Sequence, residues 1–467
     1  MFYKPLYVFF LLLISTFIHA QNTSITGTAS DAAGKIIRLK TWSDQISYRD
    51  TTLTISQIDS SGQFKLQFNL ATTIPAWLSI GLSKAELYLE PGHAYQIKFH
   101  PVKRPSNYPN FNPYLLPQNL GFTLTDSDSS GLNTSIGKAD SLLDDFLGHN
   151  LDPINPKRNK SNVEPFLEEL SNHFQFINNK FFTEYIQYNA VTIREIFGLM
   201  GKAEIARKYI RNSPVLYNHP AYMNFFNDFF QEYLLSQSQN ISLSDLDYTI
   251  NNLQSLPALM DSLGKDSLLQ NETLREFVLL KNIRSLYQSD NFNKKAVLKI
   301  LTDMGNTSRF PEHRLVAQNL IFELQRFETG QPAPDFRLND IKNKPFSLDD
   351  FRGKYVYLSF YTSWCRPCTE ELDTLQKMAA KINDSICFVT ISEDNSMEIL
   401  SDFLKKKTWD WTFLFDDTQG ELPEKYGINS FPLYILIDPE GNFLQFPAPA
   451  PGEKLEKTFN QILSKSR

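Results

Sequence analysis

Apolar and polar residues alternate strictly over residues 63–70, where the apolar positions are Phe64, Leu66, Phe68 and Leu70. This period of two is typical of a half-buried strand, and the Asp-Ser-Ser-Gly run before it indicates a hairpin turn. Shorter apolar runs at 76–80, 87–89 and 95–99 predict further strands. We therefore expect residues 21–110 to form a small antiparallel β-sandwich or barrel.

The spacing becomes helical over residues 136–326. Apolar stripes with this spacing include Phe166, Leu167, Leu170, Phe174 and Ile177; then Phe225, Phe226, Phe229, Phe230 and Tyr233; and finally Leu315, Leu320 and Leu324. Such stripes usually form the core of a helical region. The histidines there lack ligand spacing, so we expect neither a metal site nor a cofactor pocket.

A Gly-Gln-Pro-Ala-Pro linker at 330–334 precedes a third pattern, in which strands alternate with helices. Strands are expected at 355–361, 386–391 and 433–437; helices at the cysteine pair, near 397–406 and at 453–463; and a hairpin turn at 438–442. Alternation of this kind predicts an α/β layer with parallel strands. The chain is thus expected to be multidomain, with an α/β domain at 329–467.

Length and charge limit the number of domains and the kinds of partner that the chain can have. A chain of 467 residues is long enough for about three domains. Its formal net charge is −6, and no stripe of Lys or Arg follows any predicted element. Nucleic acid is therefore not an expected partner.

The first twenty residues predict a secretory signal peptide. Lys4 precedes an apolar run over residues 6–18, and Ala20 stands before a polar stretch. The alternative is an uncleaved membrane anchor, although the run is shorter than the roughly 18 residues that a spanning helix needs. We expect the mature protein in the periplasm or cell envelope, where disulfides persist.

The strongest chemical signal is the sequence Trp364-Cys365-Arg366-Pro367-Cys368. The chain has three cysteines, the third being Cys387, and none precedes this motif. A Cys-x-x-Cys pair at the start of a helix places the first sulfur near free backbone N–H groups, which favour its thiolate, and the second one turn on. We predict that Cys365 is the exposed attacking sulfur, favoured also by Arg366, and that Cys368 lies deeper and resolves the mixed disulfide.

Several ordered motifs around this pair resemble the thioredoxin superfamily, and within it the TlpA/ResA-like extracytoplasmic thiol–disulfide oxidoreductases. They are the linker with the following Asp-Phe at 335–336, the run from 346 to 354, the Trp-Cys-x-Pro-Cys motif, Glu371, and Phe431-Pro432 before the strand that ends at Asp438. The resemblance covers residues 329–467. The segments before it more weakly resemble the N-terminal extensions of large TlpA-like proteins of Bacteroidetes-type bacteria.

The resemblance implies roles for further residues around the cysteine pair. Pro432 matches the family's cis-proline, which would place Phe431 and Trp364 beside a bound substrate strand. Glu371 matches a carboxylate that would move protons at Cys368; the alternative is a solvated helix charge. Ser359 stands where cytoplasmic thioredoxins have a buried Asp, which shifts the acid–base role to Glu371. Independently of the resemblance, Cys387 lies in the apolar run 386–389 and is expected to be a small buried apolar residue; the alternative is a resolving or regulatory role.

The predicted function is therefore reduction of disulfides in envelope proteins, with electrons from a membrane thiol donor and without a cofactor. A thiol peroxidase of the same fold is one alternative, although Leu358 stands where peroxiredoxins have a Pro. A non-enzymatic scaffold with a vestigial redox domain is another, and the intact cysteine pair argues against it.

Overall fold

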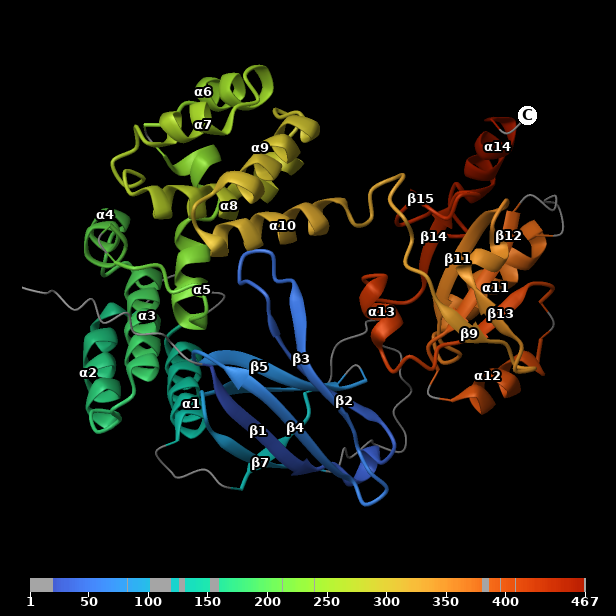
Figure 1. Ribbon diagram of the computed structural model, residues 1–467, viewed down its shortest axis with the longest axis horizontal. Helices are drawn as coiled ribbons and strands as arrows, with labels where there is room; N and C mark the ends of the chain where they lie inside the picture. The colour runs from blue at the N-terminus through green and yellow to red at the C-terminus, as the bar shows by residue number, and fades with distance from the viewer. Residues whose placement is uncertain are drawn as a thin grey trace, which may run out of the picture.

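The chain builds an N-terminal β part, a helical middle and a C-terminal α/β part in that order (Figure 1). The computed structural model describes residues 20–81, 83–100, 119–125, 131–151, 159–211, 213–238, 240–379, 386–394, 396–407 and 409–465. The expected signal peptide falls outside these residues, apart from Ala20. The multidomain fold class predicted from the sequence is confirmed.

The β part consists of two four-stranded sheets, with strand orders β4-β1-β7-β8 and β3-β2-β5-β6. Their strands are β1 (Gln21–Thr28), β2 (Ile36–Trp42), β3 (Asp50–Gln57), β4 (Gln63–Leu70), β5 (Ile74–Ile80), β6 (Ser83–Leu89), β7 (Ala94–Phe99) and β8 (Phe122–Leu124). Apolar residues of both sheets share one core. The expectation of a wholly antiparallel sandwich is wrong, because β1 pairs with β7 in parallel.

The helical part contains α1 (Leu132–Asn150), α2 (Val163–His173), α3 (Lys180–Ile196), α4 (Lys202–Ile205), α5 (Pro220–Phe229), α6 (Leu243–Asp247), α7 (Leu256–Leu263), α8 (Glu272–Gln288), α9 (Lys294–Thr307) and α10 (Pro311–Gln325). The aromatic stripe around Phe226 is buried, and the ring of Phe226 lies 4.7 Å from that of Phe277. One stripe position is wrong: Leu315 is exposed on α10, while Leu320 and Leu324 are buried.

The C-terminal sheet has the order β10-β9-β13-β12-β11-β14-β15. Its elements are β9 (Arg337–Asn339), β10 (Pro345–Ser347), β11 (Tyr355–Tyr361), α11 (Arg366–Ala379), β12 (Ile386–Ser392), α12 (Met397–Leu404), β13 (Thr412–Phe415), α13 (Glu421–Lys425), β14 (Leu433–Ile437), β15 (Phe443–Gln445) and α14 (Leu455–Lys465). β11, β12 and β13 are parallel, whereas β14 runs antiparallel to β11. The sequence pattern did not predict β13 or α13, which are short.

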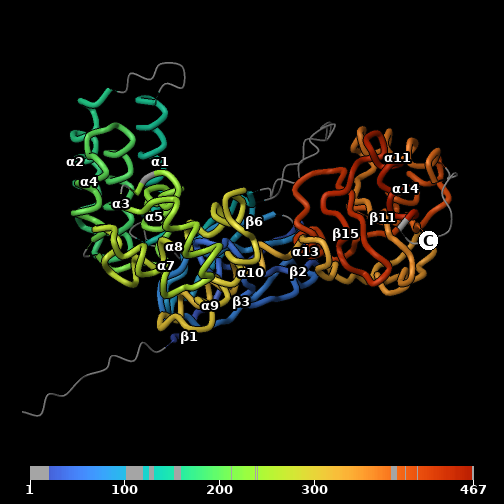
Figure 2. The backbone as a smooth tube through the Cα atoms, turned by 90° about the horizontal axis from the view of Figure 1, so that it is seen from above, coloured from blue at the N-terminus to red at the C-terminus, as the bar shows by residue number. Residues whose placement is uncertain are grey.

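α13 joins the C-terminal part to the β part, and both ribbon and tube views place it beside β2 (Figures 1 and 2). Lys40 Nζ of β2 lies 2.9 Å from an oxygen of Asp50 and 2.5 Å from one of Glu424 on α13. The backbone N–H of Ile36 donates to Gln419 Oε1 at 3.0 Å. The Lys40 side chain is only 10% exposed, so this ion-pair cluster lies within the interface.

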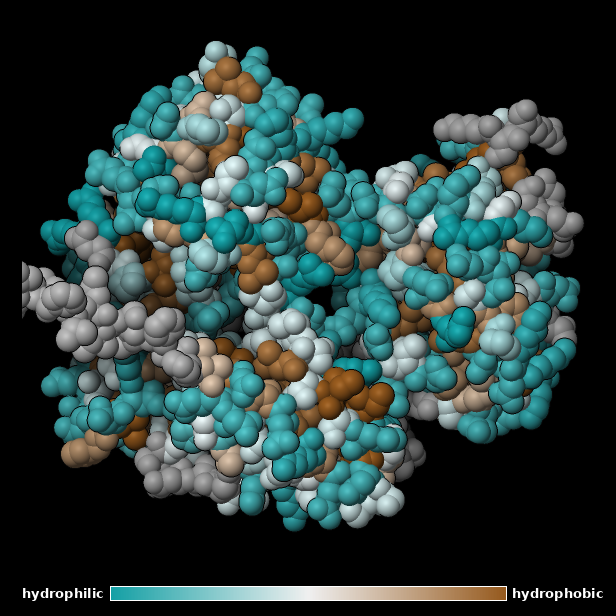
Figure 3. All heavy atoms as spheres, in the orientation of Figure 1, coloured by the Kyte–Doolittle hydropathy of each residue, from teal (hydrophilic) through white to brown (hydrophobic). Residues whose placement is uncertain are grey.

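On the face seen in Figure 3, apolar residues appear in small groups on a mainly hydrophilic surface. Scattered apolar residues are normal for a folded surface. In the part of the chain that the structure describes, no helix is both long enough and apolar enough to cross a membrane.

Replacing Lys40 by Met should loosen the contact between α13 and β2. The change leaves the carboxylates of Asp50 and Glu424 close together without a counter-charge, which we expect to cost about 1–2 kcal/mol because the cluster is partly exposed. Limited proteolysis should then cut the linker near residue 330 several times faster than in the unmodified protein. The control is Lys84→Met, which removes the more exposed Lys84–Glu86 pair of β6. Equal rates for all three proteins would show that Lys40 does not hold the interface.

Candidate active site

The two cysteines lie where β11 gives way to α11. In the structure they form a disulfide, with Cα atoms 5.3 Å apart. The backbone N–H of Cys368 donates to Cys365 Sγ at 3.3 Å, and that of Cys365 donates to the Thr362 carbonyl oxygen at 3.1 Å. The first sulfur therefore lies at the N-terminus of α11, where backbone N–H groups stabilise negative charge.

One expectation about this pair needs correction, and a second gains a detail. Cys365 is buried almost as fully as Cys368, with 3% and 1% of their surfaces exposed, because both belong to the apolar cluster that includes Trp364 and Phe431. Arg366 is an exposed residue whose guanidinium pairs with Glu370 at 2.8 Å. Glu370 therefore offsets part of the positive charge that Arg366 adds to the backbone N–H groups at the start of α11.

Phe431 and Pro432 lie at the same edge of the sheet as the cysteines. Phe360, near the end of β11, pairs with Leu433 at the start of β14, so the residues before Leu433 lie level with those after β11. The peptide bond between Phe431 and Pro432 is cis. The ring of Trp364 contacts that of Phe431 edge to face, at 6.4 Å between centroids. Trp364, Phe431 and Pro432 therefore form one apolar wall beside the disulfide.

Glu371 lies one turn beyond Cys368 on α11 and is half-buried. The hydroxyl of Tyr434 donates to its Oε2 at 2.5 Å. Burial raises the pKa of Glu371 above its ordinary value, the Tyr434 hydrogen bond opposes that rise, and the charge of Glu453 adds to it. Its neighbour Glu370 faces solvent. A half-buried carboxyl with a raised pKa is suited to exchange protons near neutral pH.

Ser359 takes no part in acid–base chemistry by itself. It is buried, and its hydroxyl lies 2.8 Å from that of Thr390. Thr390 Oγ1 also accepts from Trp411 Nε1 at 2.8 Å. Ser359 and Thr390 thus form a buried hydroxyl pair between β11 and β12.

Asp394 is a residue that the sequence pattern missed. Its carboxylate accepts from the backbone N–H and the hydroxyl of Ser363, at 3.0 and 2.8 Å, and from the Ser392 hydroxyl at 2.8 Å. It therefore fixes the loop that carries Trp364 and Cys365. The signal was present, since Asp394 follows a strand parallel to β11 and the carboxyl ends of parallel strands meet at one edge.

Two further acids lie at this edge: Glu393 after β12, which is half-buried with a buried Oε1 atom, and buried Asp416 after β13. Their carboxyl groups face one another, and Glu393 Oε1 and Asp416 Oδ2 accept from no donor among the described residues. A proton held between the two groups would satisfy both oxygens. Burial, and then the charge of Asp416, raise the pKa of Glu393 well above its ordinary value of 4.5.

The pair makes a prediction about stability. Between pH 4.5 and the raised pKa of Glu393, the folded protein holds a proton that the unfolded chain has lost. The stability that this proton contributes should therefore be fully present below pH 4.5 and be lost as the pH rises through the pKa of Glu393 in the folded protein. One proton limits the slope of this loss to about 1.4 kcal/mol per pH unit. Glu393→Gln should flatten it.

Unfolding free energies at several pH values between about 4 and 9 would measure this dependence, with Glu370→Gln as the exposed control. A pH dependence that is the same in Glu393→Gln and in the unmodified protein would contradict the shared proton.

Cys387 is the third cysteine of the chain. Cys387 lies in β12, outside the disulfide and half-buried. Among the residues that the structure describes, no three His, Cys, Asp or Glu side chains are arranged to hold a metal ion.

Comparison with known proteins agrees with this geometry. The family model described as "AhpC/TSA family" matches residues 329–445. The thiol-disulfide oxidoreductase ResA of Geobacillus thermodenitrificans is 31% identical over 127 residues, which are 26% of this chain and 71% of that protein. ResA of Bacillus thuringiensis is 29% identical over 143 residues, 30% of this chain and 80% of that protein.

Among solved structures, the thioredoxin domain of a thiol-disulfide oxidoreductase from Bacteroides vulgatus is 30% identical and covers 29% of this chain and 97% of that chain, with a TM-score of 0.27. The family match falls in the C-terminal α/β part, which contains the Cys365–Cys368 disulfide. Through this part the chain belongs to the ResA/TlpA-like thiol–disulfide oxidoreductases of the thioredoxin superfamily.

Proposed function

We propose that this protein is an extracytoplasmic enzyme that reduces disulfides in other proteins of the cell envelope, using Cys365 and Cys368. The observation that carries the proposal is the disulfide between these residues at the start of α11, with the Cys368 N–H directed at Cys365 Sγ. The thiol–disulfide oxidoreductase relatives support the same chemistry.

The reaction has two exchange steps. The Cys365 thiolate attacks a substrate disulfide, forming a mixed disulfide and releasing one substrate thiolate, which takes up a proton. The Cys368 thiol loses its proton and attacks Cys365 Sγ, releasing the second substrate thiol and leaving the Cys365–Cys368 disulfide. The substrate gains two electrons and two protons, and an external thiol must reduce the enzyme again.

Trp364, Phe431 and Pro432 are proposed to bind the substrate. They line the edge of the site, where an extended substrate strand would pair with the backbone of Phe431. Both sulfurs are buried in the oxidised protein, so a substrate must displace part of this apolar wall to reach Cys365.

The reductive direction rests on Pro367 and Glu371 in a TlpA/ResA-like arrangement, together with the partly offset charge of Arg366. A reductase in an oxidising compartment needs electrons from elsewhere, and a membrane thiol donor would supply them. The signal-like N-terminus supports the envelope location. The sandwich of residues 21–110 and the helices of 136–326 are proposed to orient a partner protein.

Reduction of insulin by the full-length protein, with dithiothreitol as donor, tests the activity. We expect turnover by the unmodified protein, none by Cys365→Ser, and a stable mixed disulfide on Cys365 in Cys368→Ser. Consumption of hydrogen peroxide should be negligible in parallel. Peroxide turnover without insulin reduction would identify a peroxidase. Insulin reduction that persists in Cys365→Ser would exclude exchange through this cysteine pair.

Glu371→Gln should slow the second exchange step by up to about 100-fold, because the half-buried carboxyl that moves the Cys368 proton is lost. The pH dependence of that step should lose the ionisation contributed by the raised pKa of Glu371. Rapid-mixing measurements of mixed-disulfide decay would follow it, with Glu370→Gln as the control one position away. A decay rate and pH profile unchanged by Glu371→Gln would make Glu371 a structural charge.

A further inference from the structure

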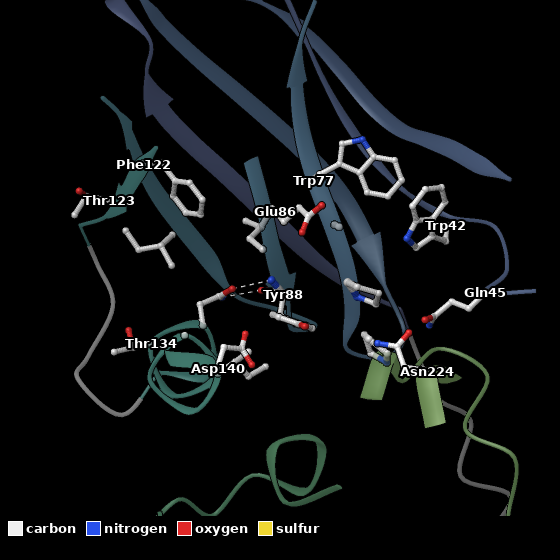
Figure 4. Close-up of a pocket in the computed structure, with 18 of the residues that line it drawn as sticks. Trp42, Gln45, Trp77, Glu86, Tyr88, Phe122, Thr123, Thr134, Asp140 and Asn224 are labelled. Carbon is white, nitrogen blue, oxygen red and sulfur yellow. Dashed lines mark hydrogen bonds between the residues drawn. The ribbon is translucent and has the colours of Figure 1, made fainter. Parts of the chain in front are cut away.

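A cavity of about 670 Å³ opens far from the cysteines, between the sheet β3-β2-β5-β6 and the helices α1 and α5 (Figure 4). Its size falls in the range of small-ligand and side-chain sites. We call it the sandwich–helix cleft and define it by its main side chains: Trp42, Trp77, Glu86, Tyr88, Phe122 and Asp140.

Aromatic rings make the walls of the cleft. Trp77 follows buried Ala76 and precedes buried Leu78, so its side chain faces away from the sandwich core. Its ring lies 4.5 Å from that of Trp42, and Trp42 meets Tyr48 edge to face at 5.6 Å. Tyr88 of β6 adds a further ring (Figure 4). Faces of Trp and Tyr attract cations, most strongly where water is partly excluded.

The charge in the cleft has one sign. Its lining includes the carboxylates of Glu86 and Asp140 but no Lys, Arg or His among the described residues. Glu86 is largely exposed and pairs with Lys84. Asp140 is half-buried on α1 and accepts from the Tyr185 hydroxyl at 2.5 Å, yet it forms no ion pair within the described chain. A half-buried carboxylate without a counter-ion, beside aromatic rings, favours a cationic ligand.

The edge of β6 suggests the shape of that ligand. The side chain of Asn133 bonds the outward N–H and C=O of Tyr88 at 2.7 and 2.8 Å, and the N–H of Leu120 donates to the Lys84 carbonyl oxygen at 2.7 Å. In an antiparallel pair, successive residues direct their backbone groups alternately toward the partner strand and away from it. Glu86 lies midway between Lys84 and Tyr88 on β6, so its backbone N–H and C=O also point away from β5. One residue of an extended chain can pair with Glu86 there.

We propose that the sandwich–helix cleft binds an extended polypeptide segment through an Arg or Lys side chain, which lies against Trp42 and Trp77 and pairs with Asp140. An aromatic cleft with carboxylates also suits a neutral oligosaccharide, but a sugar makes no use of the outward backbone groups at the edge of β6. Identifying the polypeptide as a redox substrate rests on the proposed function; the chemistry of the cleft does not.

Peptide binding to the oxidised full-length protein tests the proposal. The probe is a fluorescent, cysteine-free, seven-residue peptide of alternating Thr and Val with a central Arg, and the matched probe carries neutral citrulline in place of Arg. Fluorescence anisotropy should show binding of the Arg peptide at least about tenfold tighter. Asp140→Asn should abolish this preference, whereas Asp145→Asn, on an exposed position of the same helix, should retain it.

Trp77→Leu, which leaves Asp140 and Tyr185 in place, should weaken the Arg peptide by a similar factor and guards against a folding effect in Asp140→Asn. Equal affinity for the two peptides, no binding, or a preference that survives Asp140→Asn would overturn the proposal, as would binding of a neutral oligosaccharide at this cleft instead. Because no thiol takes part, the result is independent of insulin reduction, so failure of the redox function and failure of the cleft are separately visible.

Discussion

The parallel pairing of β11, β12 and β13 is the constraint on which the site depends. Three parallel strands end at one edge of the sheet, and the chain places its chemistry directly after each end: Cys365 after β11, Asp394 after β12 and Asp416 after β13. β14 runs the opposite way, so its beginning, with Pro432, meets the same edge. A cysteine pair, an apolar wall and a carboxyl cluster thus converge without being close in sequence.

The site contains carboxyl groups of three kinds. Glu371 has a hydroxyl donor, Tyr434, and lies on the helix that carries the cysteines, which suits proton exchange during catalysis. Asp394 is fully bonded to the loop and acts as a support for it. Glu393 and Asp416 have raised pKa values because they are buried together. At high pH these two buried carboxyl groups destabilise the fold. Groups with shifted pKa values are concentrated at functional sites, which agrees with their position at the edge that carries the cysteines.

Sequence reasoning recovered what depends on local pattern. Alternation over residues 63–70 predicted β4, and the motif at 364–368 predicted the paired cysteines and the helix that begins beside them. It did not recover what depends on distant contacts. The parallel pairing of β1 with β7 and the Lys40–Glu424 contact, which joins residues 384 positions apart, leave no periodic trace. The pairing of Arg366 with Glu370 was also not predicted, because the charge of Arg366 was considered alone.

The reduction potential of the Cys365–Cys368 pair tests most directly whether the two residues form a reducing couple. Equilibrating the full-length protein with glutathione buffers of known ratio, and counting free thiols at each ratio, would measure it. We predict a value near the roughly −270 mV of thioredoxin, because the helix N-terminus stabilises the thiolate while Glu370 offsets part of the charge of Arg366. A value near the roughly −120 mV of a dedicated oxidant would contradict a reducing couple.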